Sequence, residues 1–220
     1  SDTIKVTLRI KGENSVRSIH YYTGLGTINS SSRLTITDIN GNGATSGYLY
    51  IPKKVAAADI DAFMASKVNH NHWNAGIGGD DGNQATTGLT ISGANVQVLT
   101  NYTDNCSAIG GGGNGLANIS ITGGNVYAAC NGTGAAIGGG IGWSSAGGAA
   151  TVNISGGKVY AKNYGNLTYN GHQVGGVAIG GGSSFYSSGS KGTVNISGGI
   201  VEAYGTFGNG IGGGNSSTST

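Results

Sequence analysis

One short word recurs through this sequence of 220 residues: an isoleucine followed by two to four glycines. The word begins at Ile77, Ile109, Ile137, Ile179 and Ile211, so its period is 28 to 42 residues. A period in this range is typical of repeat architectures, in which each unit buries its apolar face only against its neighbours. The word therefore predicts a solenoid.

A second pattern fills the space between the glycine words. Three segments align as NISITGGNVYA from residue 118, TVNISGGKVYA from 151 and TVNISGGIVEA from 193, with a looser copy, GLTISGANVQV, from 88. Each contains a strand of alternating apolar residues, a tight corner and a second strand. With the glycine word, this makes three short strands per repeat. The pattern predicts an all-β chain: a right-handed parallel β-helix of about five coils.

Equivalent positions in the repeats predict columns of inward-facing side chains. The first strand supplies Ile91, Ile121, Ile154 and Ile196; the second supplies Val96, Val126, Val159 and Val201; and the isoleucines of the glycine words form a third column. The triple glycines offer a strand face without side chains. We expect either another backbone layer packed closely against them inside the protein, or a surface for a partner.

The first 75 residues fit the repeat less well. Residues 4–12 alternate apolar side chains with basic or polar ones, which predicts a strand that caps the solenoid or pairs on its edge. Residues 33–37 and 47–52 resemble a degenerate first coil, and residues 55–68 carry apolar side chains at helical spacing. We therefore expect one continuous domain: an N-terminal cap, degenerate coil and short lateral helix over 1–75, repeats over 76–214, and a Ser/Thr-rich tail over 215–220.

Composition and charge restrict the partners. Only 9% of the residues are charged and the net charge is +2, with no basic stripe of the kind that binds nucleic acid. The sequence has no run of about 18 apolar residues, so we expect no membrane insertion. The polar tail is of the kind that leads into a linker, which suggests further domains of a larger surface protein.

The two cysteines, Cys106 and Cys130, lie in equivalent loops one coil apart. Neighbouring coils are close enough for a bridge, so we predict a disulfide, which fits an extracytoplasmic location. Two unbridged thiols are the alternative.

Acidic residues gather at one glycine word and in the following coil. Asp80 and Asp81 replace the third glycine and its follower, and Asp104 comes one coil later. Oxygen-rich turns of this type can hold calcium, although a solvated turn also favours aspartate, and no other cofactor is expected. The same three residues are the catalytic candidates if the chain is a polysaccharide-active enzyme, because glycoside hydrolysis usually needs two neighbouring carboxylates.

The outward positions of the second strand carry the ligand-binding candidates. Tyr127 and Tyr160 occupy equivalent positions in adjacent coils, and Glu202 follows in the next. Such an aromatic strip on a polar sheet suits a sugar, although tyrosines can also stack across coils for stability alone. The loop over 162–176 adds a mix typical of recognition loops: Tyr164, Tyr169, Asn170 and His172.

The words AAIGGG, AIGGG and TVNISGGKVYA resemble the glycine-rich IGGG/ISGG-repeat proteins of Gram-positive bacterial surfaces, over about residues 76–214. A weaker similarity is to glycine-rich phage adhesin tips, whose glycine runs form packed layers. The first resemblance implies an exported, cell-surface protein of the carbohydrate-binding or adhesive type. We therefore expect an extracellular adhesin or carbohydrate-binding module that recognises a cell-surface glycan without catalysis. The alternatives are a glycoside hydrolase or lyase on a β-helix and a structural stalk.

Overall fold

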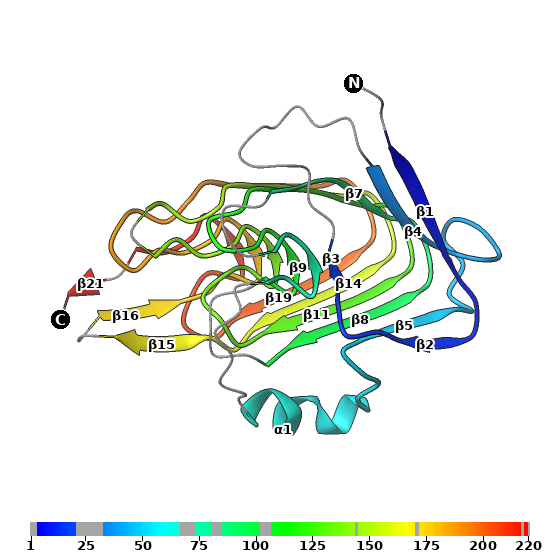
Figure 1. The fold of residues 1–220 in the computed structure, drawn as a ribbon, viewed down its shortest axis with the longest axis horizontal. Helices are drawn as coiled ribbons and strands as arrows, with labels where there is room; N and C mark the ends of the chain where they lie inside the picture. Colours follow the sequence, from blue (N-terminus) through cyan, green and yellow to red (C-terminus); the bar gives the residue numbers. More distant parts are fainter. Residues whose placement is uncertain are drawn as a thin grey trace.

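The chain folds as a parallel β-helix in the computed structural model, which describes residues 4–20, 33–66, 74–80, 85–101, 107–143, 145–169, 172–216 and 218–219. Its strands form three parallel sheets of six strands each, and successive strands of a sheet come from successive turns of the chain (Figure 1). This confirms the predicted fold class. The three sheets are called the first, second and third, in the order in which the chain visits them.

Each coil contributes one strand to each sheet. The first sheet contains β1 (Lys5–Ile10), β4 (Arg33–Asp38), β7 (Thr86–Ile91), β10 (Ala117–Ile121), β13 (Ala150–Ile154) and β18 (Gly192–Ile196). The second contains β2 (Glu13–Ser15), β5 (Tyr48–Ile51), β8 (Asn95–Thr100), β11 (Asn125–Cys130), β14 (Lys158–Asn163) and β19 (Ile200–Gly205). The third contains β3 (Ile19–His20), β6 (Ile77–Gly78), β9 (Ile109–Gly110), β12 (Ile137–Gly138), β17 (Ile179–Gly180) and β20 (Ile211–Gly212).

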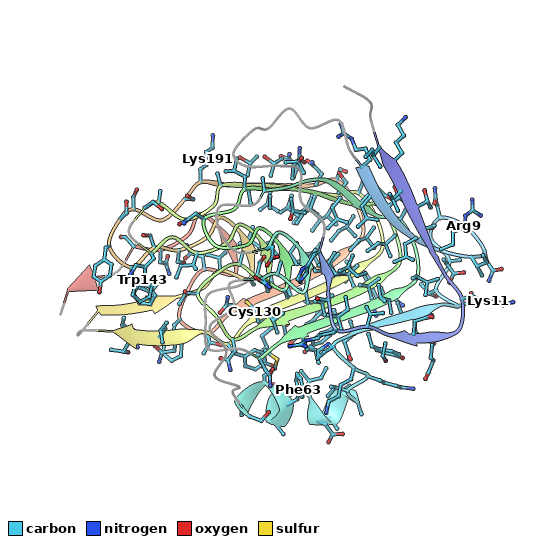
Figure 2. The ribbon with its side chains drawn as sticks, viewed as in Figure 1. Arg9, Lys11, Phe63, Cys130, Trp143 and Lys191 are labelled. Atoms are coloured by element: carbon cyan, nitrogen blue, oxygen red, sulfur yellow. The ribbon has the colours of Figure 1, made fainter. Side chains whose placement is uncertain are left out.

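The described chain therefore makes six coils, one more than the repeat count predicts. The additional coil lies at the N-terminal end, where β1 pairs in parallel with β4 and is followed by β2 and β3. The predicted capping strand is thus the first strand of coil one. Its charged side chains still mark it as an end, because Arg9 and the adjoining Lys11 point away from the strands (Figure 2).

The predicted core columns are confirmed by the strand register. Ile91, Ile121, Ile154 and Ile196 lie opposite one another across neighbouring strands, and the valines of the second sheet do the same. The isoleucines of the glycine words also align, from Ile77 to Ile211. In coils three to five these side chains are buried, so the columns form a continuous apolar core.

The triple glycines pack backbone against backbone inside the protein, the first of the two expected arrangements. The amide of Gly140 donates to Gly115 O at 3.1 Å, and the amide of Gly148 donates to Gly140 O at 2.7 Å. A Cβ built on Gly140 would overlap the carbonyl of Gly112. Only glycine permits this close approach, which explains why the glycine word returns in coils two to six.

Two excursions leave the solenoid. A 3-10 turn, η1 (Ala57–Asp59), leads into α1 (Ile60–Ala65), which lies outside the second sheet (Figure 1) and buries Ile60 and Met64 against Leu99 and Ala129. After β14, an antiparallel hairpin of β15 (Asn166–Tyr169) and β16 (His172–Gly175) extends from the strand ends and pairs with β21 (Thr218–Ser219). Among the described residues, no helix is both long and apolar enough to cross a bilayer.

Candidate functional site

The outer face of the second sheet carries an elongated groove with a volume of about 490 Å³, which we call the sheet groove. It crosses the strands from β5 to β19 and thus follows the axis of the solenoid over five coils. The groove is lined by Tyr48, Tyr50, Lys54, Val55, Ala56, Ala57, Asn95, Val96, Gln97, Asn125, Val126, Tyr127, Lys158, Val159, Tyr160, Ile200 and Glu202.

Two parallel rows of outward residues build the groove, with one residue per coil in each row. The strand register places Tyr48, Asn95, Asn125, Lys158 and Ile200 in the outer row. The inner row, two residues further along each strand, contains Tyr50, Gln97, Tyr127, Tyr160 and Glu202. Alternation along a strand puts both rows on the same face, so the groove is a direct product of the repeat.

The two central tyrosines of the inner row, Tyr127 and Tyr160, stack on each other and turn their ring edges toward the groove. The rings of Tyr127 and Tyr160 are stacked with centroids 4.6 Å apart and an interplanar angle of 13°. Tyr204 tilts against Tyr160 from the next coil, with centroids 5.4 Å apart. Because the faces of Tyr127 and Tyr160 cover each other, these rings present edges to the groove. This differs from the flat strip that the sequence suggests, and it combines cross-coil stacking with an exposed apolar edge.

One wall of the groove is the segment between β5 and α1, and Gln97 holds it in place. The side-chain oxygen of Gln97 accepts from the amide of Val55 at 3.0 Å, and its Nε2 donates to Val55 O at 2.9 Å. In the inner row, Gln97 stands between Tyr50 and Tyr127. Its coil has glutamine at this position, and the glutamine side chain binds the segment at Val55. A primary amide supplies both the donor and the acceptor that a peptide group needs.

A polar network attaches α1 to the end of the second sheet. Tyr164 donates to Asp61 Oδ1 at 2.5 Å, and Lys162 Nζ donates to the same oxygen at 3.0 Å. Hydrogen bonds from Tyr164 and Lys162 lower the pKa of Asp61, whereas burial and the Asp61 contact raise the pKa of Tyr164. Burial also raises the pKa of Tyr127, whose hydroxyl hydrogen-bonds to Tyr164. The two tyrosines therefore remain neutral hydrogen-bonding groups.

Amides and a few charges complete the lining. Asn125 Nδ2 donates to Asn95 Oδ1 at 2.8 Å, which forms a short amide ladder along the outer row. Lys158 follows on the next coil and is exposed. At the coil-two end, Lys54 Nζ lies 2.6 Å from Glu13 Oε1. The lining therefore combines aromatic edges and an aliphatic wall with amides, cations and the carboxylate of Glu202.

The structure separates the predicted ligand-binding residues into two groups. Tyr127, Tyr160 and Glu202 lie together in the groove, as members of the inner row. Tyr164 does not line the groove, because its side chain lies against α1. Tyr169 and His172 are backbone partners near the turn of the hairpin, beyond the ends of the second-sheet strands. Asn170 lies outside the described residues. None of the loop residues that the structure describes lines the groove.

The acidic candidates are only partly described. Asp80 follows β6 on the third sheet, and its Oδ2 lies 3.6 Å from His20 Nδ1. Asp81 and Asp104 lie outside the described residues, so the calcium and catalytic predictions for the three stay predictions. No group of three or more potential metal-ligating His, Cys, Asp or Glu residues occurs in the part of the chain that the structure describes.

Cys130 is buried at the end of β11. Its Sγ accepts from Asn163 Nδ2 at 3.0 Å and lies 3.6 Å from Gly134 O. Cys106 lies outside the described residues, so the disulfide also stays a prediction.

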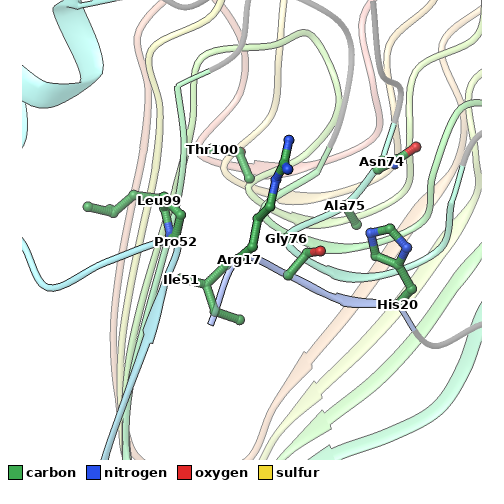
Figure 3. Close-up of a pocket in the computed structure, with 10 residues that line it drawn as sticks. Arg17, His20, Ile51, Pro52, Asn74, Ala75, Gly76, Leu99 and Thr100 are labelled. Atoms are coloured by element: carbon green, nitrogen blue, oxygen red, sulfur yellow. The ribbon is translucent and has the colours of Figure 1, made fainter. Parts of the chain in front are cut away.

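A second cavity of about 290 Å³ lies where the ends of β5 and β8 approach the third sheet (Figure 3). Its lining includes Arg17 and His20, but His20 is already within 3.6 Å of Asp80. Ile51, Pro52 and Leu99 make much of the remaining surface aliphatic. We favour the sheet groove as the functional site because it is larger and several polar side chains converge on it.

The sequence analysis missed the outer row and the wall. Asn95, Asn125 and Lys158 lie two residues before the inner-row positions, so counting back along each strand would have found them. No sequence signal identified Val55 as a wall residue, because its position depends on Gln97, 42 residues away.

The groove cannot be compared directly with a characterised site. Comparisons of this chain with family models, with curated proteins and with solved structures give no match. Its chemistry is therefore inferred from the geometry of the groove itself.

Proposed function

We propose that this protein is an extracellular carbohydrate-binding module, of the adhesin type, that holds a linear glycan in the sheet groove without catalysis. The observation that carries the proposal is the shape of the groove: it follows the solenoid axis across five coils and presents equivalent positions at each coil. A long ligand with a repeating chemical unit matches such a surface better than a compact molecule does.

The lining supports a sugar as the repeating unit. Sugar rings carry C–H groups that pack on apolar surface and hydroxyls that donate and accept hydrogen bonds. The edges of Tyr127 and Tyr160 and the wall at Val55 supply the apolar contacts. Asn95 and Asn125 supply donors and acceptors in the outer row. Neighbouring coils are about 4.8 Å apart, comparable to the length of one sugar ring in an extended chain.

Two observations favour binding over hydrolysis. Among the described residues that line the groove, Glu202 is the one carboxylate, whereas most glycoside hydrolases use two. Its Oε2 also accepts from the Tyr204 hydroxyl at 3.2 Å, which raises the pKa of Tyr204. Asp80, the described member of the alternative catalytic group, follows a strand of the third sheet and does not line the groove.

The test is retention on an array of immobilised cellulose, chitin, xylan, mannan and pectin, followed by calorimetry with oligosaccharides of the retained polymer. We expect Tyr160→Ala and Asn125→Ala each to weaken binding roughly tenfold, which corresponds to the loss of one well-placed contact. We expect affinity to rise with oligosaccharide length up to about five sugars, one per coil.

Tyr186→Ala is the matched control, because Tyr186 is an exposed tyrosine outside the groove. Equal losses for Tyr160→Ala and Tyr186→Ala would contradict the site. Release of soluble sugars from any polymer would support the enzyme alternative, and absence of retention on every polymer would favour a stalk.

A further inference from the structure

The sheet groove is lined by two lysines, and they differ in what surrounds them. Lys54 lies at the coil-two end, where its Nζ is 2.6 Å from Glu13 Oε1 and 5.7 Å from the ring centroid of Tyr50. Lys158 lies in the outer row of coil five, and among the described residues no carboxylate forms an ion pair with it. The groove therefore presents one ammonium group whose charge the described part of the chain does not balance.

The neighbours of Lys158 are uncharged. Along the outer row it stands between Asn125 and Ile200. Tyr160 lies two residues further along the same strand, so the ammonium group is on the same face as the tyrosine edges. Lys158 is exposed, and covering it with a ligand would be costly unless the ligand brought an anionic partner. The position therefore favours a ligand that carries a negative charge.

The amide ladder of the outer row ends on an acceptor beside this lysine. Asn95 Nδ2 donates to Thr45 O at 2.6 Å, and Asn125 Nδ2 donates to Asn95 Oδ1 at 2.8 Å. Each amide thus directs its donor toward coil two, and the next acceptor of the ladder is Asn125 Oδ1, on the side of coil five. Coils four and five together offer a ligand one hydrogen-bond acceptor and one cation.

We propose that the glycan is acidic and that the carboxylate of a uronic acid residue pairs with Lys158. This inference rests on the proposed function of the sheet groove. A hexuronic acid ring carries its carboxylate next to ring hydroxyls, so the carboxylate can accept from Lys158 Nζ while a hydroxyl donates to Asn125 Oδ1. The ammonium group of a lysine is a compact single charge, which one carboxylate balances.

Glu202 restricts where further acidic sugars can lie. It is the inner-row residue of coil six, one coil beyond Lys158, and its Oε2 accepts from the Tyr204 hydroxyl at 3.2 Å. A second sugar carboxylate beside Glu202 would be repelled, because like charges would lie together. We therefore expect the groove to favour a polymer in which an acidic sugar is followed by a neutral one over a polymer with a carboxylate on every sugar.

Retention of the full chain on two acidic polymers, each compared with a neutral form of the same backbone, tests the charge of the ligand. One comparison is partly against fully methyl-esterified pectin; the other is hyaluronan, in which acidic and neutral sugars alternate, against carboxyl-reduced hyaluronan. We expect at least one acidic polymer to be retained, and its neutral form to bind about fivefold more weakly, which is the upper range for one exposed ion pair.

The outcomes separate this inference from the proposed function. Equal or stronger retention of the neutral forms, or retention of neutral polymers alone, would overturn the acidic ligand and leave the carbohydrate-binding proposal standing. Absence of retention on every polymer, including the neutral ones, would overturn both.

Substitutions assign the preference to one side chain. Lys158→Gln should abolish the preference for the acidic form, and Lys158→Arg should keep most of it. Lys191→Gln is the matched control, because Lys191 is an exposed lysine beside the first sheet and its loss changes the net charge equally. An unchanged preference in Lys158→Gln, or an equal loss in Lys191→Gln, would overturn the assignment. Glu202→Gln should strengthen retention on fully de-esterified pectin, and unchanged retention there would contradict the predicted spacing of acidic sugars.

Discussion

Coils five and six have almost the same sequence and very different surroundings. TVNISGGKVYA begins coil five at residue 151, and TVNISGGIVEA begins coil six at residue 193. Both segments form the same two strands around the same corner, yet Ile154 is buried and Ile196 is half exposed. The local sequence thus determines the conformation of a coil, whereas the following coil determines how much of its core is removed from water.

We expect the largest difference in stability loss between an interior coil and the last coil for substitutions of the glycines. A Cβ on Gly139 would overlap the Gly148 carbonyl, whereas the nearest atom to a Cβ on its coil-six equivalent, Gly213, is Ser190 O at 3.2 Å. We expect Gly139→Ala to cost about 4 kcal/mol or more of unfolding free energy and Gly213→Ala less than about 1 kcal/mol. Urea denaturation of both variants measures the difference; equal losses would mean that the backbone layer does not limit stability.

A smaller contrast is expected in the isoleucine column. Ile154→Ala removes a fully buried side chain and should cost about 3 kcal/mol, because it leaves a cavity between two coils. Ile196→Ala should cost about 1 kcal/mol, since half of that side chain already contacts water. Both values come from denaturation at a protein concentration where the chain is monomeric. A larger loss for Ile196→Ala would contradict the comparison.

The smallest effect concerns the contact between coil five and α1. The pKa of Asp61 is held below its ordinary value of 3.8 by hydrogen bonds from Tyr164 and Lys162. A lowered pKa in the folded state means that the stabilisation is complete above the unfolded-state pKa and is lost as pH falls through the folded-state value. We therefore expect attachment of α1 to weaken below about pH 4.

Hydrogen exchange of the α1 amides, expressed as protection relative to the unfolded chain, measures this attachment. Asp61→Asn should remove the acid dependence while α1 stays packed through Ile60 and Met64. Coil six offers the comparison, because Tyr204 replaces Lys162 there and the one described α-helix contacts other coils. An unchanged acid dependence in Asp61→Asn would assign the effect to another group.

Most of the solenoid could be predicted from the sequence because its determinants are local. Alternation of Ile and Val, paired glycines at corners and the returning Ile-Gly-Gly word each lie within a few residues. Coil one is harder to recognise, because β3 carries His20 where the strands of the later coils have glycine. Its membership in the solenoid becomes evident only from pairing with β6.

The groove could be predicted only in part for a related reason. The inner-row residues Tyr127 and Tyr160 follow from the repeat, but the orientation of their rings depends on stacking across coils. The wall depends on a contact between Gln97 and Val55. These two residues lie in segments that share no sequence pattern. Long-range contacts of single residues leave no periodic signal in the sequence.

The one-residue-per-coil construction of the groove has a consequence for how this protein can change. Near-identical repeats are prone to unequal recombination, which adds or deletes whole units. Because each of coils two to six supplies one position to each row, such an event would lengthen or shorten the recognition surface by one step without rebuilding the neighbouring contacts. Selectivity for ligand length and affinity for each unit could then evolve separately, the former by copy number and the latter by point substitution.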